Sequence, residues 1–347
     1  MLNLACGLSD LGFPTDLVLA QKRGPYLKDV PSSVRIIDLG ARQTMLSLPA
    51  LVRYLKRERP EAMVAALHQA GVTAVWAKRF YKFQLAISVQ NQVSVEAAQP
   101  ASWRLRFMPA FVRNFYPRAD ALVGVSEGVA LDLAEFLGLP SDRTRVIYNG
   151  VIAPNLLPRA KEPLDHPWFA QGQPPVLVAV GRLGPQKDFP TLLRAFQRVR
   201  DQREVRLIIL GEGEDRASLE SLVQDLKLGE DIQLPGFAEN PFAYLHRAAV
   251  FVLSSKWEGL PTVVIEALGC GTQVVATDCP SGPMEILKGG KYGRLVPMEN
   301  PSALADAILA TLDQPKTLPP PESWQPYEID AVARQFAALL APEVDLT

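Results

Sequence analysis

The sequence predicts an α/β protein built from two doubly wound domains. Short apolar runs alternate with helical patterns along almost the whole chain, and this alternation is typical of βαβ units with parallel sheets. A chain of 347 residues is long for a single hydrophobic core, which favours two domains. A proline-rich stretch, 154–175, breaks the alternation near the middle, and we interpret it as the connection between them.

The first half of the chain has an unusual start. Residues 2–8 show a helical pattern, and the first strand-like run is reached only at Leu17. A doubly wound half-domain normally opens with a strand and a loop, so we expect that a strand and its loop are missing from the front. The predicted strands are 17–19, 34–37, 63–65, 85–89 and 121–125, and the predicted helices are 48–57, 72–81, 103–115 and 129–137.

The alternation restarts after the proline-rich connection. The predicted strands of the second half are 176–180, 205–210, 232–234, 250–253 and 273–276. A second proline-rich break, 315–321, precedes a last helical pattern at 329–340. We therefore divide the chain into a first domain at 1–153, a linker at 154–175, a second domain at 176–314 and a C-terminal helix and tail at 315–347.

Charge is distributed unevenly between the halves. Residues 1–161 contain 20 Lys and Arg against 12 Asp and Glu, a net charge of +8, whereas the remainder contains 16 against 25, a net charge of −9. Opposite signs can help two halves to close on each other, and a basic half can attract lipid head groups or pyrophosphate. Scattered solvated charge is the alternative.

Composition excludes several classes of protein. The 3 cysteines are too few for a disulfide framework, which fits a reducing cytoplasm. The 3 histidines argue against a histidine-centred metal site. No apolar run approaches the ~20 residues that a membrane span needs, and no pattern of a signal peptide is present.

Two glutamates flank a turn that follows the predicted strand 250–253. Glu258 lies in the turn, and Glu266 lies in a helix that Pro261 and Thr262 are expected to open. This order places the two carboxylates on one side of a crevice, with free N–H groups of the helix start between them. The arrangement suits a ligand that is part phosphate and part polyol, such as a nucleotide sugar. A turn residue and a solvent-facing helical carboxylate are the alternative.

A second loop supplies cations. Gly181 and Arg182 leave a predicted strand, and Lys187 precedes a helix that Asp188 would cap. Arg182 and Lys187 are expected to project toward the carboxyl ends of the strands. There they could neutralise a diphosphate, Arg182 through paired donors and Lys187 as a point charge. Two solvated loop cations are the alternative.

The run Gly211-Glu212-Gly213 also follows a predicted strand. A dinucleotide-binding motif would require a third glycine where this chain has Arg216. We therefore interpret the run as a tight strand-to-helix turn rather than as a nicotinamide site.

The motifs together resemble the retaining glycosyltransferases of the large GT-B family 4. In the second half the resemblance is carried by Gly181-Arg182 with Lys187, by Glu258 with Glu266, by 269–272, and by 278–283 with Glu285. In the first half it is looser, through 24–26, 38–40, 119–120, 125–127 and 148–150. The resemblance implies two Rossmann-like domains facing a cleft, an acceptor side in the first, a donor site in the second, and a C-terminal helix returning to the first.

The resemblance also implies a role for each motif residue. Arg182 and Lys187 would hold the donor diphosphate and stabilise the leaving nucleotide, which is electrostatic catalysis without a metal or another cofactor. Glu258 would bind hydroxyls of the donor sugar, and Glu266 would bind the ribose. The donor-binding set is completed by Gly181, Gly259, Leu260, Pro261, Thr262 and Val263. The leaving diphosphate would help to deprotonate the acceptor on the same face of the sugar, which retains the anomeric configuration.

The chain departs from the family pattern in two places. The family usually opens with a strand and a glycine-rich loop, and both are absent here. Since that strand would lie in the middle of the first sheet, where backbone groups must be paired, we expect a weakened first domain and impaired or absent transfer. The second departure is Gln90, which stands where many relatives carry a histidine. It would keep a hydrogen bond to the donor sugar but carry no proton, and an ordinary strand-end turn is the alternative.

The expected acceptor side contains an aromatic and basic pattern between residues 98 and 118. Trp103, Phe107, Phe111 and Phe115 are spaced by four and form one stripe on a helix. Such a helix can rest on an anionic membrane, which would suit a lipid-linked acceptor. We favour the alternative that the stripe faces the core, as helices of βαβ units do.

These patterns lead to one hypothesis and two alternatives. The hypothesis is a cytoplasmic, retaining glycosyltransferase of polysaccharide biosynthesis that moves a hexose from a nucleotide sugar, preferably a uridine diphosphate sugar, to a glycan or lipid-linked acceptor. We expect this enzyme to need no metal ion or other cofactor and to bind no nucleic acid. Peripheral contact of the basic first domain with the inner face of the membrane stays an open alternative. The alternatives are a nucleotide-sugar epimerase of the same architecture and a truncated, catalytically impaired donor-binding protein.

Overall fold

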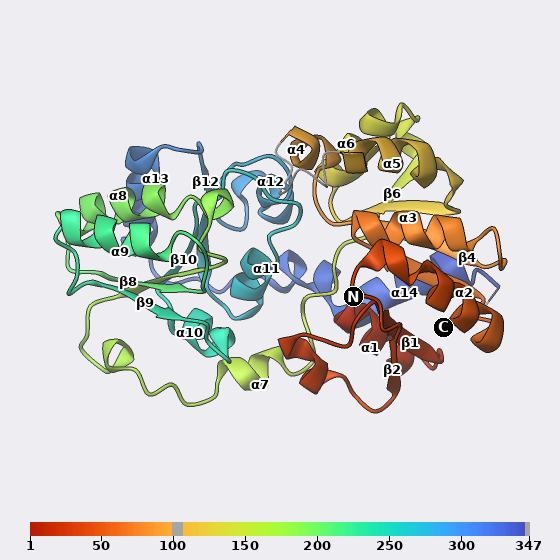
Figure 1. Ribbon diagram of the computed structural model, residues 1–347. Helices are drawn as coiled ribbons and strands as arrows, with labels where there is room; N and C mark the ends of the chain where they lie inside the picture. Colours follow the sequence, from red (N-terminus) through yellow and green to blue (C-terminus); the bar gives the residue numbers. More distant parts are fainter. Residues whose placement is uncertain (99–106, 344–347) are drawn as a thin grey trace. The chain divides into compact units, whose positions relative to one another are not determined.

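The computed structural model describes residues 1–98 and 107–343. The chain forms two compact units, Met1–Gly150 together with Tyr327–Thr347, and Val151–Pro326 (Figure 1). Both units contain parallel sheets with helices, so the predicted α/β class is confirmed. The last helix belongs to the first unit, as the expected return of the C-terminal helix requires.

The second unit contains a parallel sheet of six strands in the order β12-β11-β10-β7-β8-β9. The strands are β7 (Val176–Val180), β8 (Arg206–Leu210), β9 (Ile232–Gly236), β10 (Val250–Leu253), β11 (Gln273–Thr277) and β12 (Arg294–Val296). The order runs outward from β7 on one side and from β10 on the other, which is the order of a doubly wound domain.

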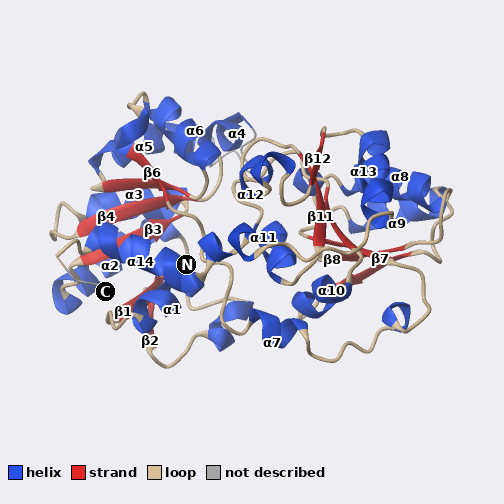
Figure 2. Ribbon diagram, turned by 180° about the vertical axis from the view of Figure 1, so that it is seen from behind, coloured by secondary structure: helices blue, strands red, loops and turns tan. Residues whose placement is uncertain are grey.

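Helices cover both faces of this sheet (Figure 2). The helices of the second unit are α7 (Leu156–Ala160), α8 (Phe189–Arg200), α9 (Arg216–Asp225), α10 (Pro241–Arg247), α11 (Thr262–Gly269), α12 (Pro283–Ile286) and α13 (Pro301–Leu312). A buried core joins β7, β8 and β10 to α8 and α13 through side chains such as Leu177, Phe196, Val252 and Ile308. Because the central strands are covered on both faces, they appear in the sequence as continuous apolar runs.

The first unit contains two parallel sheets, and no hydrogen-bonded strand pair joins them within the described residues. β1 (Thr15–Leu19) pairs with β2 (Val34–Asp38). The other sheet has the order β3-β4-β5-β6, with β3 (Ala62–Ala66), β4 (Gln84–Val89), β5 (Ala121–Gly124) and β6 (Thr144–Val146). β1 and β3 are therefore both edge strands.

Seven helices belong to the first unit in the part of the chain that the structure describes. They are α1 (Leu2–Asp10), α2 (Leu48–Glu58), α3 (His68–Ala77), α4 (Val93–Ala98), α5 (Met108–Phe115), α6 (Glu127–Leu137) and α14 (Ile329–Leu340). The helical start predicted for residues 2–8 is confirmed by α1. α1 packs against α14, and Leu4 shares a buried core with Ala333 and Phe336.

The predicted aromatic stripe faces inward where the structure describes it. Trp76 of α3 meets the rings of Phe111 and Phe115 edge-on, at centroid distances of 6.2 and 5.4 Å. Phe107 is exposed, and Trp103 lies outside the described residues. Phe111 and Phe115 thus pack against α3, in agreement with the favoured, core-facing interpretation. No helix in the described ranges has the length and apolarity needed to cross a membrane.

The unit boundaries differ from the predicted ones. Residues 154–175 and 315–326 belong to the second unit rather than to a linker and a C-terminal segment. α7 packs against α10, with Leu156 and Ala160 buried. The guanidinium of Arg206 lies 5.0 Å from the ring of Trp168. Prolines interrupt regular elements, but apolar side chains between them still pack on the neighbouring core.

Candidate functional site

The loops after β7 and β10 meet at the carboxyl edge of the second sheet. β7 and β10 are neighbouring parallel strands, and the strand order reverses between them. Ligands of open α/β sheets bind beside the carboxyl ends of the strands at such a reversal. The first loop contains Lys187 and the second contains Glu258, so the fold brings together two motifs that the sequence places 71 residues apart.

Lys187 and Glu258 form an ion pair between these loops. Lys187 Nζ lies 2.6 Å from Glu258 Oε1, and Ser255 Oγ donates a hydrogen bond of 2.6 Å to the same oxygen. The two charged side chains are 16% and 7% exposed, so solvent ions screen the pair weakly. The other oxygen, Oε2, has Gln186 Nε2 at 3.5 Å. That distance is too long for a strong hydrogen bond, and Oε2 therefore remains available to a ligand hydroxyl.

Glycines permit the close approach of the loops around Lys187. A Cβ atom on Gly181 would lie 2.9 Å from Lys187 Cε, so the lysine side chain passes directly over this glycine. A Cβ atom on Gly211 would lie 1.9 Å from the carbonyl oxygen of Gly181, and Gly211 has a φ of +138°. The run after β8 thus serves as a tight turn against the β7 loop, in agreement with our interpretation of Gly211-Glu212-Gly213.

Arg182 pairs with Glu214, a residue that the sequence analysis did not single out. Its Nε and Nη2 atoms both donate to Glu214 Oε2, over 3.2 and 2.9 Å. The pair is exposed, with 77% of the arginine and 52% of the glutamate side chain accessible. A backbone hydrogen bond at Glu214, and then the bonds from Arg182, lower the pKa of the Glu214 carboxyl.

The turn between the two predicted glutamates carries free amide groups. The N–H groups of Gly259, Leu260 and Thr262 have no acceptor among the described residues, and Pro261 has no N–H. The side chain of Leu260 is buried, as is that of Val263, which fixes the backbone beneath them. These amides precede or open α11, where free donors and the helix dipole favour an anion.

Glu266 lies one turn into α11 and is partly buried. Burial raises the pKa of its carboxyl to about 7, while the positive charge of Arg159 acts in the opposite sense. The carboxylate has no hydrogen-bond or ion-pair partner among the residues that the structure describes. A carboxylate that is partly removed from water and has no partner is costly, and a hydroxyl of a ligand would supply a hydrogen bond.

Gln90 lies in the first unit, directly after β4. Its Nε2 atom donates to Ser88 Oγ over 2.9 Å, and its Oε1 atom accepts from Asn149 Nδ2 over 3.0 Å. Nearby, His68 is bonded to both Tyr116 and Glu96. The contribution of Gln90 to donor binding stays a prediction.

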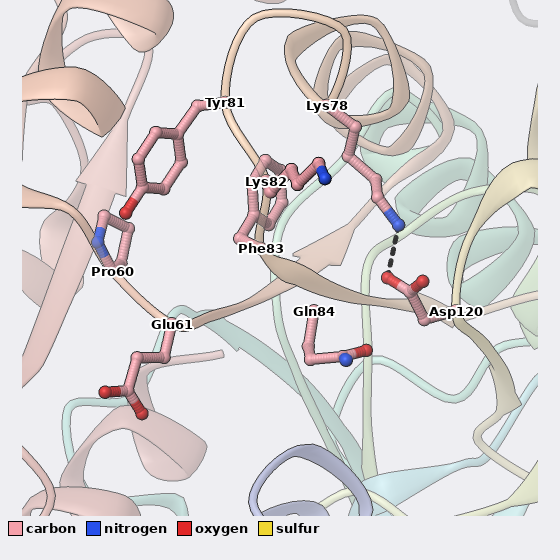
Figure 3. Close-up of a pocket in the computed structure, with 8 residues that line it drawn as sticks. All are labelled: Pro60, Glu61, Lys78, Tyr81, Lys82, Phe83, Gln84 and Asp120. Carbon is pink, nitrogen blue, oxygen red and sulfur yellow. Dashed lines mark hydrogen bonds and ion pairs between the residues drawn. The ribbon is translucent and has the colours of Figure 1, made fainter.

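An open hollow of about 480 Å³ in the first unit is lined by none of the predicted site residues. Figure 3 shows Tyr81, Lys82 and Phe83 around it, with the ion pair of Lys78 and Asp120 at one side. It lies beside Gln84, the first residue of β4, and therefore at the amino edge of the sheet. Since open α/β sheets bind ligands at the carboxyl edge, the size of this hollow does not make it the candidate site.

The described part of the chain offers no set of side chains that could bind a metal ion. No group of three or more His, Cys, Asp and Glu side chains there could hold an ion. Arg182 and Lys187, the cations predicted to meet a diphosphate, both lie in the loop after β7 of the second unit.

The sequence matches two family models that together span most of its length. Residues 161–327 match the glycosyl transferases group 1, and residues 1–150 match the glycosyl transferase 4-like domain. The loop residues Lys187, Glu258 and Glu266 fall inside the first of these matches.

Curated relatives and solved structures agree with the family models. Over 201 residues, covering 58% of this chain and 53% of the relative, the chain is 30% identical to a Campylobacter jejuni N-acetylgalactosamine-N,N'-diacetylbacillosaminyl-diphospho-undecaprenol 4-alpha-N-acetylgalactosaminyltransferase. It is 27% identical to the amylovoran biosynthesis glycosyltransferase AmsD of Erwinia amylovora, over 84% of this chain and 79% of that protein. Its fold is similar to that of Anabaena HepE in complex with UDP, with a TM-score of 0.79, 19% identity and coverage of 98% and 96%. The matches span only 53% of the Campylobacter relative and 44% of an uncharacterized glycosyltransferase of Methanocaldococcus jannaschii.

Proposed function

The chain belongs to the GT4-type glycosyltransferases of the GT-B fold, and we propose that it transfers a hexose from a nucleotide diphosphate sugar to a glycan or lipid-linked acceptor. We further propose that the donor is a uridine diphosphate sugar, that the anomeric configuration is retained, and that no metal ion takes part. The observation that carries the proposal is the ion pair of Lys187 and Glu258 at the reversal of strand order.

The arrangement at the second sheet supports a donor site with separate places for phosphate and sugar. Lys187 is a fixed positive charge in a poorly hydrated place, where it can stabilise the negative charge that develops on the leaving nucleotide. Glu258 keeps Lys187 in position through one oxygen, and its other oxygen can accept a hydrogen bond from a sugar hydroxyl. The ion pair would then both bind the donor and orient its sugar.

The turn after Glu258 supports contacts to the rest of the donor. The free amides of Gly259, Leu260 and Thr262 suit phosphate or sugar oxygens. Glu266 lies farther into α11 and has an unpaired carboxylate, which suits the paired hydroxyls of a ribose. Gln90 is proposed as a donor contact from the first unit.

Uridine is favoured as the nucleotide because the solved structure of HepE contains UDP. A lipid-linked acceptor is favoured because the Campylobacter relative is named for transfer to a diphospho-undecaprenol sugar. These two observations concern the related proteins, and they indicate which compounds should be tested first on this chain.

The test is a thermal-shift screen of the purified full chain with nucleoside diphosphates and their hexose derivatives, in the presence of EDTA. A ligand at one hundred times its dissociation constant stabilises a protein by about 2.7 kcal/mol, which is a measurable rise in Tm. We expect UDP and one UDP-hexose to raise Tm, and transfer of that hexose to a polyprenyl diphosphate sugar with retained configuration in the product.

The outcomes of this screen distinguish the alternatives. Release of a changed nucleotide sugar without an acceptor would identify an epimerase. Binding of UDP without transfer or donor hydrolysis would identify an impaired donor-binding protein. If no nucleoside diphosphate raises Tm, the proposed donor site is wrong.

A further inference from the structure

Arg182 is an exposed side chain with a defined orientation. Long exposed arginines usually sample many rotamers, and fixing one of them costs conformational entropy. Here Nε and Nη2 both bond to one oxygen of Glu214. The two bonds therefore favour one direction of the guanidinium before any ligand arrives.

Glu214 is itself held against the loop that carries Arg182. Leu183 N donates to Glu212 O over 2.9 Å, and Asp215 N donates to Leu183 O over 3.0 Å. A Cβ atom on Gly184 would lie 3.0 Å from Glu214 Oε1, so the carboxylate lies directly against this glycine. The loop after β8 and the loop after β7 thus form one backbone frame around the Arg182 and Glu214 pair.

The pairing leaves one edge of the guanidinium free. An arginine has five N–H donors in a planar fork, and Glu214 takes one from Nε and one from Nη2. The two donors of Nη1 and the second donor of Nη2 remain. Together they form the end of the fork that binds two phosphate oxygens side by side.

We propose that Glu214 is a positioning residue that holds Arg182 with its free edge ready for the diphosphate of the donor. The inference rests on the proposed function and deepens it, because it names the residue that orients one of the two donor-site cations. Glu214 stays bonded to one edge of the guanidinium while the diphosphate binds the other. Its negative charge weakens the attraction of Arg182 for phosphate only slightly, because exposed ion pairs interact weakly in water.

The experiment is calorimetric titration of UDP into the full chain and three variants at one salt concentration. Glu214→Ala frees Arg182 and is expected to weaken UDP binding about three- to tenfold, the usual cost of ordering a long side chain on binding. Glu214→Gln keeps an oxygen acceptor and is expected to stay within about twofold of the wild type. Glu220→Ala is the matched control. Glu220 is also 52% exposed and paired with an arginine, but that partner is Arg216, so no change is expected.

A double-mutant cycle separates positioning from a general structural effect. In an Arg182→Ala background, Glu214→Ala is expected to cause no further loss of UDP affinity. Equal or tighter UDP binding by Glu214→Ala alone would overturn the inference while leaving the proposed function intact. The same loss in the Arg182→Ala background would also overturn it. If the wild-type chain binds no UDP, the proposed function fails and the inference fails with it.

Discussion

The two units of this chain are built from the same kind of βαβ repeat but differ in the continuity of their sheets. In the second unit, six parallel strands form one sheet, and the strand order reverses at its centre. In the first unit, the strands form a pair and a separate set of four. Apart from Gln90, the candidate donor residues gather where the sheet is continuous, because the reversal places two loops side by side at one edge.

The first unit compensates for its divided sheet with helices and side chains. α14 comes from the end of the chain and packs on α1, and Phe336 enters a core with Leu4 and Val123. Asp16 of β1 and Arg35 of β2, which face each other in the ladder, form a bidentate ion pair. Edge strands such as β1 and β3 leave backbone groups without a strand partner. We therefore expect the first unit to be the less stable of the two.

The largest effect is expected from the buried ion pair of the continuous sheet. Lys187→Ala removes the fixed cation and should lower the rate of transfer about 10²- to 10³-fold, as the loss of a preorganised charge-stabilising group does. The measurement is the rate of hexose transfer at saturating donor. Lys256→Ala is the control, because Lys256 lies in the loop after β10, as Glu258 does, but pairs with the exposed Glu299. It should stay within a few-fold of the wild type.

A second variant keeps this prediction testable if Lys187→Ala unfolds. A buried Glu258 without its lysine is an uncompensated charge, which costs about 3–5 kcal/mol in comparable pairs. The double variant Lys187→Met, Glu258→Gln removes both charges, and it should fold and remain inactive. Substantial transfer by the folded double variant would show that the pair is not part of the donor site.

The comparison of the units predicts separate effects on stability and nucleotide binding. Phe336→Ala should destabilise the first unit by about 3–5 kcal/mol, the usual cost of deleting a buried phenyl ring. UDP affinity should change less than twofold, since the candidate contacts in the second unit are untouched. Urea unfolding by circular dichroism and UDP titration measure the two properties. Phe196→Ala, in the core of the second unit, should instead lower both stability and UDP affinity. If the two variants behave identically, the predicted difference between the units is wrong.

Glu266 provides a pH-dependent test of the second unit. Its folded pKa is about 7 against an ordinary value of 4.5, so the folded chain binds the proton more tightly than the unfolded chain. The contribution of this group to stability is therefore fully present below pH 4.5 and is lost as pH rises through about 7. Glu266→Gln should raise the free energy of unfolding at pH 8 by about 1–2 kcal/mol and have little effect at pH 4.5. We place this below the full linkage value because the carboxylate keeps some contact with water.

Urea unfolding at pH 4.5, 6, 7 and 8 measures this dependence. Glu220→Gln, which alters an exposed carboxylate, should follow the wild-type curve. Wild-type and Glu266→Gln curves that run parallel across the range would contradict the assignment.

The smallest effect is expected from the ion pair that ties the two-stranded sheet. Arg35 bonds both oxygens of Asp16 over 2.8 and 2.6 Å and also reaches Glu58. Arg35→Ala should lower the stability of the first unit only slightly, because the pair is partly exposed. Arg57→Ala also removes a contact of Glu58 but none of Asp16, and should change stability by less than about 0.5 kcal/mol. Equal effects of the two variants would show that the bond across β1 and β2 contributes nothing specific.

Much of the fold follows from local patterns in the sequence. The strands β7 and β10 were predicted because they are buried on both faces and consist of continuous apolar residues. β6 and β12 were not predicted, since each has three residues and includes an arginine. α3 begins at His68 rather than at residue 72, because the helix starts directly after β3 and its first turn lacks the apolar spacing that we used.

Only part of the candidate site could be predicted from the sequence, because local motifs indicate some of its residues but not their distant partners. Lys187 and Glu258 lie in short motifs with a recognisable order, so the sequence indicated both residues. Glu214 was missed because its partner, Arg182, lies 32 residues away and no local spacing connects them. An acidic residue in the loop after the strand next to β7 is the pattern that could have revealed it, since neighbouring parallel strands end at the same edge.

The sequence by itself determined the α/β class and the family, because apolar periodicity and short motifs are local properties of the chain. It also indicated the residues that we propose for the donor site. The tertiary structure decided which of these residues contact each other. It paired Lys187 with Glu258 and Arg182 with Glu214, assigned residues 154–175 to the second unit, and divided the first sheet in two. These outcomes depend on which strands become neighbours, and that choice is made by packing between segments far apart in the chain.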